Sequence, residues 1–160
     1  MLPTLVKAKA LYLSGKLCFF ENAYANSLRN YRKAIDLLTE QLDGSSEIGW
    51  EDKVKAKTRI AKCYQNMGLT KSMSSNHKQA QEICDKSLPI IETLIEEEES
   101  LPEETASATQ RNRHSKILYN YWLKKAILLK RSSSFRESKE TLENLKARIN
   151  AHQATLSEGT

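Results

Sequence analysis

Cysteine and histidine are the side chains of this chain that most often act as nucleophiles or metal ligands. The sequence holds three of each: Cys18, Cys63, Cys84, His77, His114 and His152. No two cysteines have C-x-x-C spacing, and the histidines follow no metal-ligand pattern. The cysteines lie among apolar neighbours in predicted helices, where cysteine usually serves as a small buried hydrophobic residue. We therefore expect neither a catalytic thiol nor a bound metal.

Motifs of the common enzyme classes do not occur in the sequence. There is no G-x-x-x-x-G-K-[ST] phosphate loop, G-x-G-x-x-G fingerprint, G-x-S-x-G elbow or H-E-x-x-H pair. The carboxylates lie on predicted solvent faces or in one acidic run, which is more typical of hydrated surface than of a general acid–base pair. We expect a protein that is not an enzyme and needs no cofactor.

Composition predicts one all-α domain. The 160 residues are 39% hydrophobic and 28% charged, with only five glycines and three prolines, and good helix formers dominate. No apolar run approaches the roughly 20 residues of a membrane helix, and the first residues lack the basic and apolar regions of a signal peptide. We expect a soluble cytoplasmic protein, with the nucleus as the alternative location.

Apolar residues recur at three- and four-residue steps, as on one face of a helix. We expect a third helix to end at Gly68, followed by a polar loop over 69–76. Pro89 should either kink the next helix or begin a new one capped by Ser87. The whole chain, 1–160, then forms antiparallel hairpins at about 5–42, 50–94 and 106–152, with an acidic linker at about 95–105 and a loose tail at 153–160.

Three hairpins share one pattern of large and small residues. The first contains Leu11, Gly15, Cys18, Ser27, Tyr31 and Ala34; the second Ala61, Tyr64, Gly68, Ala80, Cys84, Ser87 and Leu88; the third Trp122, Ala126, Leu129, Phe135, Ser138, Leu142 and Leu145. The pattern resembles the tetratricopeptide repeat, in which small residues let paired helices approach closely. The resemblance gives that role to Gly15, Ala61 and Ala126 on the first helices, and to Ser27, Ala80 and Ser138 on the second.

The resemblance implies a short right-handed solenoid, and the chain departs from it in three places. The second hairpin carries an expected extra loop of about seven residues before Ala80, Pro89 interrupts its second helix, and Leu145 replaces a small residue. An irregular helical bundle is the simpler alternative. The segment from Ala8 to Gly68 is also similar to a microtubule-interacting and trafficking domain, a three-helix bundle.

The resemblance implies a concave groove lined by the first helix of each hairpin, and this groove predicts the binding residues. They are Lys9, Tyr12, Lys16, Phe19, Lys55, Arg59, Lys62, Asn66, Lys124, Ile127 and Arg131, with Thr58, Asn120, Leu123 and Lys130 on the same faces. The set is basic, with Tyr12 and Phe19 as aromatic anchors. It suits an acidic or amphipathic peptide or helix of another protein. We therefore expect a scaffold or adaptor, with docking in a larger assembly as an alternative and RNA binding as a weaker one.

Acidic residues concentrate in one segment of this basic chain. The net charge is +5, yet seven glutamates lie between 92 and 104, so the rest of the chain is far more basic. One hypothesis is that this segment folds onto the groove and competes with the partner.

Overall fold

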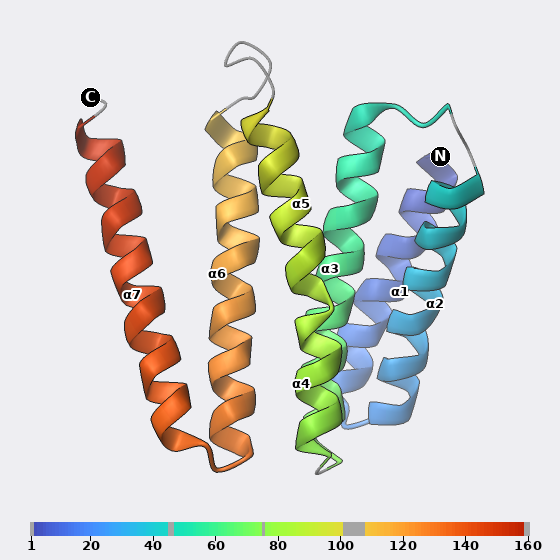
Figure 1. Ribbon diagram of the computed structural model, residues 1–160. Helices are drawn as coiled ribbons and strands as arrows, with labels where there is room; N and C mark the ends of the chain where they lie inside the picture. Colours follow the sequence, from blue (N-terminus) through green and yellow to red (C-terminus); the bar gives the residue numbers. More distant parts are fainter. Residues whose placement is uncertain (1, 45–46, 75, 101–107, 159–160) are drawn as a thin grey trace.

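The computed structural model describes the chain except residues 1, 45–46, 75, 101–107 and 159–160, and the described part is all-helical (Figure 1). Its helices are α1 (Leu2–Phe20), α2 (Tyr24–Gly44), α3 (Trp50–Ser72), α4 (His77–Asp85), α5 (Ser87–Glu99), α6 (Ala108–Arg131) and α7 (Phe135–Glu158). The described residues contain no strand, so the predicted all-α class is confirmed. No helix among them is long and apolar enough to cross a membrane.

The helices pack as a row of neighbours in chain order. α1 pairs with α2, α3 with α4 and α5, and α6 with α7. Between pairs, α3 contacts both α1 and α2, and α6 contacts α3, α4 and α5, while α7 contacts α6 alone among the described helices. Each pair therefore meets only the next pair in the row.

Close contacts inside each pair recur at one sequence spacing. Ser27 Oγ donates a hydrogen bond to the Gly15 carbonyl at 2.7 Å, and Ser138 Oγ donates to the Ala126 carbonyl at 2.7 Å, both across 12 residues. A Cβ added to Gly15 would lie 2.7 Å from the Tyr31 ring. Small residues on the first helix thus admit the second helix at close range.

The same contact in the second pair corrects the expected role of Gly68. An added Cβ there would lie 2.9 Å from the carbonyl oxygen of Ala80, which is again 12 residues away. Gly68, and not Ala61, is therefore the close-approach residue. Gly68 does not end α3, which continues through Ser72. The loop expected over 69–76 therefore begins only at Met73. Because residues 69–72 are helical, the extra loop of about seven residues expected before Ala80 is not formed. A glycine inside a helix costs about 1 kcal/mol relative to alanine, and tight packing on α4 offsets it.

Pro89 divides the second helix of the middle pair into α4 and α5. Proline has no amide hydrogen, so it cannot donate to the carbonyl four residues earlier, and α4 ends at that residue, Asp85. A new helix was one of the two expected outcomes, a kink being the other, but Ser87 does not cap it. The Ser87 hydroxyl donates back to the Cys84 carbonyl at 2.7 Å, and α5 has no side-chain cap.

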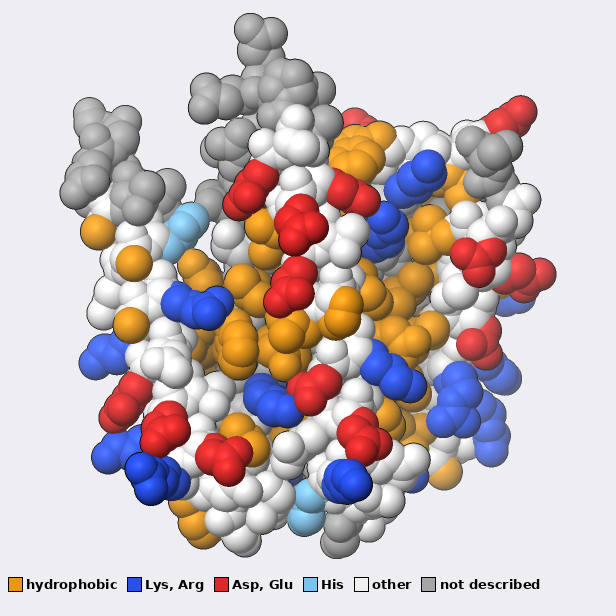
Figure 2. Space-filling model, viewed as in Figure 1, with side chains coloured by type: hydrophobic (Ala, Val, Ile, Leu, Met, Phe, Trp, Pro, Cys, Tyr) orange, Lys and Arg blue, Asp and Glu red, His pale blue; other side chains and the backbone are white. Residues whose placement is uncertain are grey.

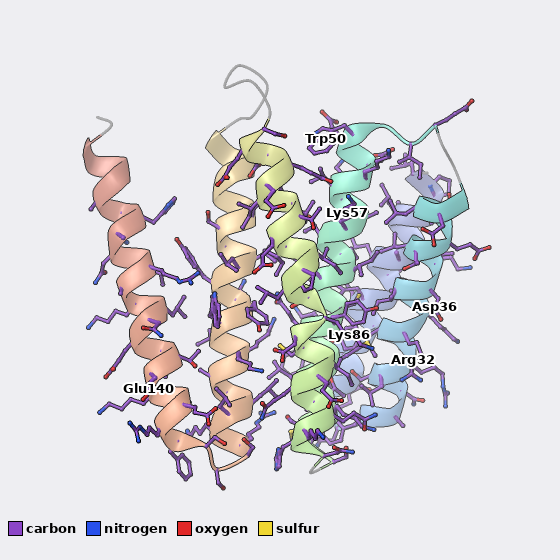
Figure 3. The ribbon with its side chains drawn as sticks, in the orientation of Figure 1. Arg32, Asp36, Trp50, Lys57, Lys86 and Glu140 are labelled. Atoms are coloured by element: carbon purple, nitrogen blue, oxygen red, sulfur yellow. The ribbon has the colours of Figure 1, made fainter. Side chains whose placement is uncertain are left out.

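Two other helix bounds also differ from expectation. α5 continues through Glu99, so the first part of the predicted acidic linker is helical. Lys57 of α3 lies toward this helix (Figure 3), with its Nζ 3.2 Å from a Glu97 carboxylate oxygen. α7 continues through Glu158, so residues 153–158 are helical instead of loose. The rest of the linker, 101–105, and the final residues 159–160 lie outside the described residues.

Two hydrophobic clusters hold the row together, and α3 contributes to both. One joins α1, α2 and α3 and includes Tyr31, Leu38 and Ile60. The other joins α3 to α4, α5 and α6 and includes Ala61 and Leu128. The adjacent residues Ile60 and Ala61 pack into different clusters, so α3 is buried on two sides and separates the two clusters, as a central wall.

Candidate peptide-binding groove

Three adjoining cavities form a continuous groove across α1, α3 and α6. The largest, about 550 Å³, lies between α3 and α6. It shares Lys62, Ile117 and Asn120 with a second cavity of about 260 Å³ that reaches α1. The second shares Lys16 and Asn66 with an apolar cavity of about 130 Å³ beside Phe19. The residues that line these cavities therefore come mainly from the first helix of each of the three pairs.

Cations dominate the lining of this groove. The basic side chains that line it are Lys16, Lys55, Arg59, Lys62, Lys116 and Lys124, and the only lining carboxylate among the described residues is Glu51. Lys16, Lys55, Arg59 and Lys124 make no ion pair within the described part of the chain. Acidic side chains instead gather along α5 (Figure 2). The groove therefore presents positive charge that a ligand can neutralise.

Tyr12 organises the cations and is not the exposed anchor that was expected. Only 9% of the residue is exposed, and its ring lies 5.9 Å from that of Tyr31. The Arg59 guanidinium lies over the Tyr12 ring at 4.7 Å and Lys16 Nζ at 5.6 Å. Asn66 Nδ2 donates to the Tyr12 hydroxyl at 3.2 Å. Tyr12 therefore holds cations of α1 and α3 at the centre of the groove through cation–π contacts.

Lys124 is a mostly buried cation of the groove. The pKa of its ammonium is lowered to about 8, mainly by burial, and the neighbouring charges of Lys16 and Lys62 contribute to this shift. Its Nζ donates to the side-chain oxygen of Gln65 at 3.4 Å, and Gln65 in turn donates to the Ile117 carbonyl. The ammonium has one neutral hydrogen-bond partner, so a bound carboxylate would stabilise its charged form.

Most of the predicted binding residues meet in the groove. Those that line it are Tyr12, Lys16, Phe19, Lys55, Arg59, Lys62, Asn66 and Lys124, together with Thr58 and Asn120.

Three of the predicted binding residues do not line these cavities, and neither do Leu123 and Lys130, which were predicted on the same faces. Lys9 is exposed on α1, and Ile127 is half-buried on α6. Arg131 ties α6 to the end of α3 by donating to the Leu69 carbonyl and to the Ser72 hydroxyl. These three residues are therefore outside the candidate site.

Sequence reasoning missed several lining residues on α6 and α3. They are Glu51, Val54, Gln65, Leu69, Thr70, His114, Lys116 and Ile117, with Phe20 and Tyr31 at the apolar end. Lys116 and Ile117 lie one helical turn before Asn120, so extending the predicted face by three or four residues would have found them. The remainder depend on how the helices cross.

The acidic segment does not line the groove within the described residues. Glu97 pairs with Lys57, and Glu98 lies 2.8 Å from Nδ1 of His114, whose ring borders the end of the largest cavity. Glu97 and Glu98 are thus held by Lys57 and His114 outside the cavity lining. The hypothesis of competition inside the groove now concerns Glu103 and Glu104, which lie outside the described residues.

The cysteines take the places of small apolar residues. Cys63 and Cys84 are fully buried, and burial raises the pKa of each thiol to about 12. Both thiols are therefore protonated at neutral pH and weak as nucleophiles. Within the described part of the chain, no three His, Cys, Asp or Glu side chains are placed to hold a metal ion.

No family model, curated protein or solved structure is significantly similar to this chain.

Proposed function

We propose that this chain is a tetratricopeptide-like interaction module that binds an acidic peptide segment of a partner protein. The repeated 12-residue spacing between close-approach residues supports the repeat. So does the order of contacts, in which each first helix meets the next first helix and each second helix meets the following pair. An irregular helical bundle would not be expected to repeat either the 12-residue spacing or the order of helix contacts.

The three-helix alternative has less support. α1, α2 and α3 do contact one another, as a microtubule-interacting and trafficking domain would require. The opposite side of α3, however, buries Ala61 in a second cluster and brings Gly68 against α4. A helix buried on two sides suits an inner position of a longer stack better than the edge of a three-helix bundle.

The observation that carries the proposed function is the groove, whose lining has six cations and one carboxylate among the residues that the structure describes. Lysine and arginine bind carboxylates through charge-assisted hydrogen bonds, and Asn66 and Asn120 add neutral donors. The apolar end beside Phe19 and Leu69 has room for one aliphatic side chain. An extended peptide with several carboxylates and one leucine-type residue fits this lining, and binding would be weakened by salt.

Fluorescence anisotropy tests this proposal with a labelled peptide of about a dozen residues that carries several Glu and one Leu. The groove variant is Arg59→Glu with Lys62→Glu, and the matched control is Arg32→Glu with Lys33→Glu on the exposed side of α2 (Figure 3). Both change the net charge equally. We expect the groove variant to bind at least about tenfold more weakly and the control to change less than about twofold.

Three outcomes would contradict the groove assignment. Equal weakening by both variants would mean that only the overall charge matters. Equal binding of a peptide with Gln in place of Glu would mean that carboxylates are not recognised. Tighter binding of a single-stranded RNA with a steep salt dependence would assign the groove to nucleic acid. Circular dichroism of each variant confirms that the helices persist.

A further inference from the structure

α1 exposes a continuous apolar face that no described helix covers. Leu2, Val6, Leu13, Leu17 and Phe20 recur at three- and four-residue multiples, and all are among the exposed large hydrophobic residues. Val6 is 60% exposed and Leu17 63%. The described helices that contact α1 are α2 and α3, and both lie against its other side. This face adjoins the groove at Phe20 and at Lys16, which lies along its edge, and is otherwise separate from it.

One position of this face, that of Leu17, is buried on the first helices of the other two pairs. Aligning Gly15 with Gly68 and Ala126 places Leu17 with Thr70 on α3 and Leu128 on α6. Thr70 and Leu128 are each only 1% exposed, against 63% for Leu17. The same position is therefore a helix-packing position in the second and third pairs and is open in the first.

The helix that covers these positions is the second helix of the preceding pair. Thr70 Oγ1 lies 3.4 Å from Ser27 Oγ of α2, and Leu128 belongs to the cluster that includes Cys84 and Ile91 of α4 and α5. The corresponding space on α1 has the geometry of a helix-packing surface, with small Ala10 between Val6 and Leu17 allowing close approach.

Charge on α1 defines the chemistry of a complementary helix. The sequence from Leu2 to Phe20 contains three lysines, Lys7, Lys9 and Lys16, and no carboxylate. At 100° per residue, Lys7 lies on one side of the apolar face and the other two lie on the opposite side. A second copy of α1 packed on this face would bring lysines against lysines. A helix with carboxylates on both sides of its apolar stripe would pair with them.

We propose that the outer face of α1 binds an amphipathic helix of a partner protein, with an apolar stripe on Val6, Ala10 and Leu17 and flanking carboxylates beside the lysines. The partner helix takes the place that α2 occupies on α3. α7, at the other end of the row, differs because its outward positions hold Lys139, Glu143 and Asn150. Among the described residues, the outer side of α1 is thus apolar, whereas these positions of α7 are polar.

Binding of designed helical peptides tests the proposal on the full chain. The probe is a fluorescein-labelled peptide of 19 residues, the length of α1, with Leu at every third or fourth position and Glu on both flanks. The comparison peptide has Lys on the flanks. The test variant is Val6→Ser with Leu17→Ser, and the matched control is Phe135→Ser with Leu142→Ser, which changes two exposed apolar residues of α7.

We expect the Glu-flanked peptide to bind the wild type and the α7 control equally, and the α1 variant at least about tenfold more weakly. The Lys-flanked peptide should bind at least about tenfold more weakly than the Glu-flanked one. Arg59→Glu with Lys62→Glu should leave this binding unchanged, which separates it from binding in the groove.

Equal binding to the α1 variant, equal binding of both peptides, or no binding of the Glu-flanked peptide would overturn the proposal. Sedimentation velocity and co-sedimentation with phosphatidylserine vesicles identify the other occupants. Self-association or vesicle binding that the wild type shows and the α1 variant loses would assign this face to a second copy or to a lipid surface, and would equally overturn the proposal.

Discussion

Replacing Lys124 by methionine should stabilise the fold and weaken ligand binding at the same time. The ammonium is mostly buried, has one neutral hydrogen-bond partner and lies near Lys16 and Lys62. Methionine fills a similar volume without a charge. The substitution therefore removes an unfavourable buried charge from the free protein and, in the same step, one cation from the groove.

The size of the effect follows from the lowered pKa. A fall from 10.5 to about 8 corresponds to roughly 3 kcal/mol of differential free energy, at 1.36 kcal/mol per unit. Loss of the hydrogen bond to Gln65 costs about 1 kcal/mol of this, and the side chain's remaining exposure reduces it further. We expect Lys124→Met to be about 1–2 kcal/mol more stable than the wild type near pH 7.

The pH dependence gives the sign of the effect an independent check. Between about pH 8 and 10.5 the unfolded chain holds the Lys124 proton and the folded chain does not, so this group's contribution to stability rises with pH. Buried Cys63 and Cys84 act in the opposite direction, but they are common to both proteins. The advantage of the variant should therefore shrink as the pH rises above about 8.

Urea unfolding followed by circular dichroism at about pH 7 and about pH 9.5 measures this difference. Lys139→Met, an exposed lysine on α7, is the control and should change stability by less than about 0.5 kcal/mol. The reasoning is refuted if Lys124→Met is less stable than the wild type at the lower pH, or if its advantage is the same at both values. In the anisotropy assay the same variant should bind the acidic peptide several-fold more weakly.

Two further predictions concern packing and thiol chemistry. Gly68→Ala should destabilise the fold by about 1–3 kcal/mol, because the new methyl group would lie 2.9 Å from the backbone of α4. The control Gly44→Ala, at a position with open space around it, should be neutral or slightly stabilising. Equal effects of the two substitutions in thermal unfolding would contradict the close-approach role of Gly68. Burial raises the pKa of the Cys63 and Cys84 thiols to about 12. Iodoacetamide at about pH 8 should therefore label half-buried Cys18 first, as measured by mass spectrometry. Equal labelling of all three cysteines in the native protein would disprove the protection of Cys63 and Cys84.

The sequence placed several lining residues on one face of the middle helix although the register of that helix was wrong. Ala61 was taken as the residue of close approach, and the structure gives that role to Gly68, seven residues later. Seven residues are nearly two helical turns, so the shift returns to almost the same face. Lys55, Arg59 and Lys62 were therefore placed correctly for a partly incorrect reason.

Other features depend on tertiary contacts that periodicity does not encode. Glycine more often ends a helix than continues it, and only the close packing of α4 on Gly68 reverses that preference. Tyr12 was expected to be an exposed anchor because it falls on the groove face. Its ring is instead covered by Arg59 and packed beside Tyr31, and these contacts come from two other helices.

The arrangement of helices also implies an order of local unfolding. α3 contributes buried residues to both hydrophobic clusters. α7 contacts α6 alone among the described helices and has few buried side chains, among them Ser138 and Leu145. In a linear array, each unit is stabilised mainly by its neighbours, so the terminal unit opens most easily. Amide hydrogens of α7 should exchange fastest and those of α3 slowest. The wall of α3 that supports the groove would then stay intact while the far end of the chain opens and closes.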